Sequence, residues 1–128
     1  EHFLSYLWER KITLIVPVPL HSRRKRKRGF NQAEIVAKVL SENTGIAMDA
    51  GAVKRIKATS PQKELGDKGR KRNIRGAFAV QKNVKGENIV LIDDIYTTGS
   101  TLDEAARVLK KAGAENVYFL TVSIGQGI

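Results

Sequence analysis

Residues 89–101 of this 128-residue chain read IVLIDDIYTTGST. The first four residues are apolar at consecutive positions, which is typical of a strand buried on both faces of a parallel sheet. Two aspartates follow, and a segment rich in Thr then leads into an apolar pattern with helical spacing over residues 100–112. Ligands of open parallel sheets bind beyond the carboxyl ends of the strands, so we expect the residues after Ile92 to carry the function.

The segment after the two aspartates has the composition of a phosphate-binding loop. It contains four hydroxyl side chains and one glycine: Thr97, Thr98, Gly99, Ser100 and Thr101. Glycine permits close approach to the backbone, and the amides and positive dipole end of a helix attract an anion. Ser and Thr are also common helix caps, so it is the succession of buried strand, two acids and this loop that predicts a binding site.

The paired acids are candidates for sugar or metal binding. Asp93 and Asp94 can accept hydrogen bonds from sugar hydroxyls or hold Mg²⁺ through water. The chain has no Cys and only two His, His2 and His21. It therefore builds neither a disulfide framework nor a Cys/His zinc site by itself, and any metal sits mainly on oxygen ligands.

The rest of the chain alternates between strand and helix patterns. Helices are predicted at 2–11, with Leu7 and Trp8 on its apolar face, and at 32–44, with apolar positions at Ile35, Val36, Val39 and Leu40. Further strands are predicted at 12–18, 52–55, 77–80 and 117–122. This order indicates an α/β fold with a mostly parallel sheet, and the length allows one domain over 1–128 with 1–11 as a lead-in helix.

Basic residues are concentrated in two segments. The net charge is +10, with +6 from residues 23–28 and +7 from residues 54–76, so the remainder sums to −3. Such patches favour binding of a polyanion, which could be nucleic acid, a membrane surface or a small polyphosphate. The alternative is a basic face that is only solvated. Residues 56–75 also lack apolar periodicity, and we expect them to form a long mobile loop.

Nothing in the sequence indicates a membrane span or a targeting segment. The longest apolar stretch, 14–20, is far shorter than the roughly 18 residues of a candidate span. We therefore expect a soluble, cytoplasmic protein. The chain starts at Glu1 without a methionine, and we expect it to be a fragment of a longer protein.

The motifs resemble those of a known family. Residues 89–101 are similar to the phosphoribosyl pyrophosphate (PRPP) motif of type I phosphoribosyltransferases at nearly every position. Further segments resemble the ComF family, and the likeness covers about 14–122; these segments are 17–20, 28–32, 61–62, 70–73 and 76–78. The resemblance implies a Rossmann-like core in which a mostly parallel sheet is flanked by helices.

The resemblance also implies roles for individual residues. Asp93 and Asp94 would contact the ribose hydroxyls of PRPP, residues 97–101 would wrap the 5′-phosphate, and Mg²⁺ would accompany the pyrophosphate. The pyrophosphate would lie around residues 20–28, where His21 and Arg28 are the candidates for binding it. The alternative for His21 is that it is an ordinary surface residue. In that family a zinc-binding module with paired Cys often precedes the core, so this chain corresponds to the core domain.

The reaction implied by the resemblance needs no protein nucleophile. A nitrogen of the acceptor attacks the anomeric carbon as pyrophosphate leaves, so the placement of charge dominates catalysis. Arg70 and Lys71 are the candidates for stabilising the departing pyrophosphate, with solvation as the alternative for each. A PRPP sensor without turnover and a module that binds single-stranded nucleic acid in DNA uptake are the alternative functions, and a homodimer stays open.

Overall fold

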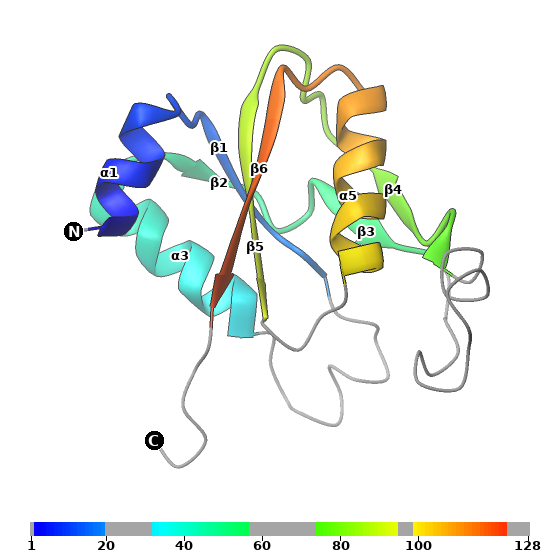
Figure 1. Ribbon diagram of the computed structural model, residues 1–128, viewed down its shortest axis with the longest axis horizontal. Coiled ribbons are helices and arrows are strands. Elements are labelled where there is room, and N and C mark those ends of the chain that lie inside the picture. Colours follow the sequence, from blue (N-terminus) through cyan, green and yellow to red (C-terminus); the bar gives the residue numbers. More distant parts are fainter. Residues whose placement is uncertain (1, 20–31, 57–73, 95–98, 123–128) are drawn as a thin grey trace.

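The computed structural model describes residues 2–19, 32–56, 74–94 and 99–122 (Figure 1). Three helices and six strands lie within these ranges: α1 (His2–Glu9), β1 (Leu14–Pro17), α3 (Gln32–Thr44), β2 (Ala47–Met48), β3 (Val53–Arg55), β4 (Phe78–Val80), β5 (Asn88–Asp94), α5 (Gly99–Lys111) and β6 (Asn116–Val122). The predicted helices and strands are all present, and their ends agree with the prediction to within a few residues.

The main sheet has four parallel strands in the order β2-β1-β5-β6. The helix α3 connects β1 to β2, and α5 connects β5 to β6, as parallel neighbours require. The strands β3 and β4 form a separate antiparallel pair. The mostly parallel α/β architecture predicted from the sequence is therefore confirmed.

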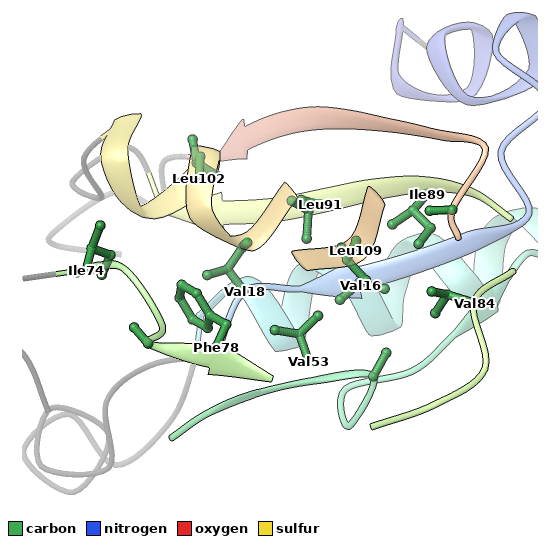
Figure 2. Close-up of a cluster of buried hydrophobic side chains, with 14 residues drawn as sticks. Val16, Val18, Val53, Ile74, Phe78, Val84, Ile89, Leu91, Leu102 and Leu109 are labelled. Carbon is green, nitrogen blue, oxygen red and sulfur yellow. The ribbon is translucent and has the colours of Figure 1, made fainter. Parts of the chain in front are cut away.

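Two hydrophobic clusters cover the two faces of the sheet. Ile89 and Leu91 of β5 belong to the cluster shared with α5 and the β3–β4 pair, which Figure 2 shows. Val90 and Ile92 belong to the cluster shared with α1 and α3. All four side chains are fully buried, and each such burial stabilises the fold by about 1.5–3 kcal/mol. Burial on both faces explains why residues 89–92 of β5 are all apolar.

Glycines end the two long helices. Gly45 follows α3 with a φ of 77°, and its N–H donates to the carbonyl of Ser41 at 2.9 Å. Gly113 follows α5 with a φ of 109°. An L side chain is strained in this left-handed region, so both glycines act as helix C-caps.

The apolar faces of the helices α1 and α3 agree only in part with the prediction. Trp8 is 61% exposed, and Ile35 and Val39 are each 48% exposed. Leu7 and Leu40 are buried as predicted. The other buried residues of α3 are Ala33 and Ala37, because two small alanines let the helix approach the sheet closely. The two-residue strand β2 was not predicted, since two residues carry no periodic signal.

The predicted mobile loop at 56–75 falls mainly on residues 57–73, which lie outside the described ranges. Its two ends differ from each other. Ile56 is exposed, whereas Ile74 is 3% exposed and packs in the cluster of Figure 2. Ile74 therefore belongs to the core.

No helix within the described part of the chain is long and apolar enough to cross a membrane.

Candidate functional site

The connections of the main sheet change direction between β1 and β5. These strands are neighbours, but the connection after β1 leads to β2 on one side, and the connection after β5 leads to β6 on the other. The helices α3 and α5 cover opposite faces of the sheet (Figure 1). At such a switch point the loops after the two strands diverge, and ligands bind in the crevice between them.

Asp93 lies at this switch point. Its backbone pairs with Thr121 of β6, and just before it the carbonyl of Ile92 accepts a hydrogen bond from the N–H of Val18 at 2.9 Å. The Asp93 side chain is 2% exposed and, by strand alternation, lies on the α5 face with Ile89 and Leu91. Burying a carboxylate at a strand end costs free energy unless a hydrogen-bond donor or a cation compensates its charge. Buried carboxylates of this kind are typical of binding sites.

The first turn of α5 begins at the same edge of the sheet. Gly99 is exposed, Ser100 is half-buried and Thr101 is 6% exposed. The first four amides of a helix have no partner within the helix, and its dipole makes this end positive. This end of α5 can therefore receive an anion.

Gly99 leaves open space at the start of the helix. A Cβ added there would meet no heavy atom within 4 Å, and the backbone is not in the left-handed region. Neither the packing nor the backbone conformation thus requires glycine at this position. Close approach of a ligand to the backbone is a reason for glycine that fits this geometry.

The structure brings together only part of the predicted site. Asp93 and residues 99–101 lie at the carboxyl edge of the sheet, and Asp94 ends β5 opposite Val122. The Asp94 side chain is outside the described part of the structure. The other predicted site residues also lie outside the described ranges; they are His21, Arg28, Arg70, Lys71, Thr97 and Thr98.

The chemistry of the described site fits a magnesium ion that the ligand helps to hold. Within the described ranges, no three or more His, Cys, Asp or Glu side chains form a group that could hold a metal. Mg²⁺ is commonly bound through one or two carboxylates together with water and substrate phosphates. Asp93 supplies a carboxylate of this kind, and Asp94 is its neighbour in the chain.

One charged residue of this region was missed by the sequence analysis. Glu104 of α5 is 6% exposed, and its Oε2 accepts a hydrogen bond from the N–H of Gly76 at 3.0 Å. Arg107 donates to both carboxylate oxygens, from Nε to Oε1 at 2.8 Å and from Nη2 to Oε2 at 2.7 Å. This network joins α5 to the turn that precedes β4.

The surroundings of Glu104 keep it ionised. The hydrogen bond from Arg107 holds the pKa of the carboxyl below its usual value, although burial acts in the opposite direction. The Gly76 amide and the charges of Arg107 and Arg75 lower this pKa further. The hydrogen bond between Glu104 and Arg107 also raises the pKa of Arg107. The sequence does carry one signal that could have identified Glu104: it is an acid beside Ala105, within the apolar pattern of the predicted helix.

Comparison with known families gives a match over most of the chain. The profile of the family described as "Phosphoribosyl transferase domain" matches residues 10–124. A structure described as the allosteric regulatory enzyme of purine biosynthesis has a TM-score of 0.57 and 20% identity, covering 92% of this chain and 24% of that one. At this identity the likeness shows the shared fold alone.

Several bacterial proteins are more similar in sequence. The "DNA utilization protein YhgH" of Salmonella typhi is 43% identical over 103 residues, which are 80% of this chain and 45% of that protein. The "Competence protein F" of Haemophilus influenzae is 42% identical over 106 residues, covering 80% of this chain and 46% of that protein. The "Competence protein ComFC" of Bacillus subtilis is 35% identical over 121 residues, covering 92% and 47%.

The chain spans about half the length of these relatives. The family profile nevertheless covers nearly all of it, and the parallel sheet carries Asp93 and the start of α5 at its carboxyl edge. The phosphoribosyltransferase type predicted from residues 89–101, and the ComF family predicted from the further segments, are therefore confirmed: the chain belongs to the ComF family of phosphoribosyltransferase-type domains.

Proposed function

We propose that this domain binds PRPP together with Mg²⁺ at the carboxyl edge of its sheet. One observation carries the proposal: the buried carboxylate of Asp93 and the open start of α5 at Gly99 lie at the same switch point. A sugar phosphate needs acceptors for its hydroxyls and a positive cradle for its phosphate. The two features supply one of each.

The proposed contacts follow the chemistry of the residues. Asp93 and Asp94 accept hydrogen bonds from the ribose hydroxyls, and residues 97–101 donate backbone and hydroxyl hydrogen bonds to the 5′-phosphate. His21 and Arg28 contact the pyrophosphate. Bound Mg²⁺ neutralises part of the pyrophosphate charge, and Asp93 and Asp94 would hold it, directly or through water.

A transfer reaction is the catalytic form of this proposal. The acceptor nitrogen forms a bond to the anomeric carbon while the bond from that carbon to the pyrophosphate oxygen breaks, and the nitrogen then loses a proton. Arg70 and Lys71 stabilise the charge that develops on pyrophosphate. A domain that binds PRPP without turnover uses the same contacts and acts as a sensor.

Thermal unfolding with a panel of ligands tests the binding proposal. PRPP with Mg²⁺ at about a hundredfold excess over its Kd stabilises the folded state by about 2.7 kcal/mol, so Tm rises by several degrees. Ribose 5-phosphate and pyrophosphate each make part of the contacts, and we expect smaller rises at the same concentration. A Tm that PRPP leaves unchanged contradicts the proposal.

Nucleic-acid binding is a second candidate function. Six consecutive basic residues at 23–28 exceed what one pyrophosphate needs, and the names of several relatives refer to DNA utilization or competence. Single-stranded DNA carries the regularly spaced charges that such a run neutralises. We propose contact with single-stranded DNA through this run, in addition to PRPP binding.

The salt dependence of DNA binding tests the second candidate. Each phosphate contact to a single strand contributes about −0.7 to the slope of log affinity against log salt concentration. Changing Arg23, Arg24 and Lys25 to Ala should therefore reduce the slope magnitude by roughly two units. The affinity for PRPP should not change. A triple variant that binds single-stranded DNA like the wild type shows that the run is a solvated surface, and loss of PRPP assigns it to the pyrophosphate site.

A further inference from the structure

The hydrogen bonds of Glu104 join two segments that are distant in the sequence. Glu104 and Gly76 are 28 residues apart, and the bond between them fastens the turn at 74–76 to α5. The turn is also fixed within itself, since the N–H of Ala77 donates to the carbonyl of Ile74 at 2.9 Å. Ile74 is buried on the same cluster as Leu102 of α5 (Figure 2). The turn is thus held by both packing and a charged acceptor.

Glu104 lies close to the helix end that the proposed function assigns to phosphate. Glu104 follows Thr101 by three residues, so the two side chains lie on one face of α5, about one turn apart. At 1.5 Å per residue, Gly99 and Glu104 are separated by about 7.5 Å along the helix axis. The turn at 74–76 is therefore fixed within roughly two helical turns of the α5 start.

A carboxylate at this place is unfavourable for an anion site unless something offsets it. Like charges repel, and the repulsion is weakly screened over less than a Debye length of about 8–10 Å. Arg107 offsets the charge of Glu104 with two hydrogen bonds, and Arg75 lies near enough for its charge to act on the same carboxylate. The local balance of these three side chains is therefore positive.

We propose that Glu104 is a positioning residue for the anion site. By accepting the Gly76 N–H it holds the turn at 74–76 beside the first turns of α5, and so keeps the positive charge of Arg75 near a phosphate group bound at residues 99–101. This inference rests on the proposed function and adds Arg75 to its binding residues. Arg75 is an exposed residue of this turn.

Positioning and simple electrostatics predict opposite signs for one substitution. Glu104→Ala removes a negative charge next to the anion site, which by charge alone tightens PRPP binding. If Glu104 instead places the turn, the substitution releases Gly76 and Arg75, and we expect PRPP affinity in the presence of Mg²⁺ to fall at least tenfold. Asp103→Ala is the matched control, because Asp103 is an exposed acid on the same helix and its removal changes the charge equally.

Calorimetric titrations of a small set of variants decide the matter. Arg75→Ala should weaken PRPP binding to a similar extent, and the double variant Glu104→Ala/Arg75→Ala should bind no more weakly than either single variant, because both act through one contact. Glu104→Gln keeps an acceptor for the Gly76 N–H and should regain most of the affinity. Asp103→Ala should bind like the wild type or slightly more tightly.

Four outcomes overturn the proposal, and the last of them also refutes the proposed function. Glu104→Ala that binds PRPP as tightly as Asp103→Ala excludes a positioning role, and so do losses that multiply in the double variant. If Glu104→Ala does not fold, Arg75→Ala gives the answer, because Arg75 is exposed. An Arg75→Ala variant that binds PRPP as tightly as the wild type also excludes the positioning role. A wild-type chain that does not bind PRPP refutes the proposed function itself, and the role of Glu104 with it.

Discussion

The double variant Asp93→Asn/Asp94→Asn is expected to bind PRPP with Mg²⁺ at least a hundredfold more weakly than the wild type. Both substitutions preserve side-chain size but remove the charge that strengthens hydrogen bonds from ribose hydroxyls and attracts the metal ion. A hydrogen bond to a charged group contributes about 1.5–3 kcal/mol, and 1.4 kcal/mol corresponds to a factor of ten in affinity. Loss of two such contacts therefore accounts for the expected effect.

This result has to be separated from a loss of fold. Asp93 is almost fully buried, so circular dichroism and thermal unfolding of the variant should accompany the titration. Asp103→Asn serves as the matched control, since it neutralises an exposed acid on α5 that lies outside the proposed contacts. The assignment of the two aspartates is wrong if the folded double variant and the wild type bind PRPP equally well.

Gly99→Val is expected to abolish binding of the 5′-phosphate while the fold persists. The added side chain meets no protein atom near its Cβ, and the backbone conformation at Gly99 suits an L residue. It does occupy the space through which a phosphate approaches the first amides of α5. We expect PRPP affinity to fall by about two orders of magnitude or more, because several amide contacts to the phosphate are lost together.

Gly51→Val provides the matched control for this substitution. Gly51 is exposed, lies outside the left-handed region, and its Cβ would make only an ordinary contact of 3.5 Å with the Asp49 side chain. Its titration with PRPP should match the wild type, and the circular dichroism of both variants should be nearly unchanged. Unfolding caused by Gly99→Val would show instead that this glycine has a structural role.

The sequence predicts those parts of the fold that local signals determine. The strand β5 is recognisable because burial on both faces makes it apolar at consecutive positions, and α3 ends as expected because Gly45 can adopt a positive φ. The exposure of Trp8 could not be predicted in this way. It depends on how α1 packs on the sheet, and several rotations of a short helix are compatible with its apolar residues.

In the candidate site, too, the residues set by local sequence could be predicted, and those that depend on packing could not. Asp93 and Gly99 follow directly from the order of strand, acids and helix, since the carboxyl end of a parallel strand is where ligands bind. Glu104 accepts a hydrogen bond from Gly76, 28 residues away in the chain, and although an acid within the apolar pattern of α5 is a signal, no local pattern identifies its partner. Only the packing of α5 against the turn before β4 reveals it.

Titration calorimetry of the wild-type chain with PRPP tests the central claim most directly. The measurement compares one titration in excess Mg²⁺ with another in which a chelator has removed the divalent ions. We expect saturable binding with one PRPP per chain in Mg²⁺, and clearly weaker binding without it, because the metal ion neutralises pyrophosphate charge next to the two aspartates. Absence of saturable binding in both titrations would contradict PRPP recognition by this domain.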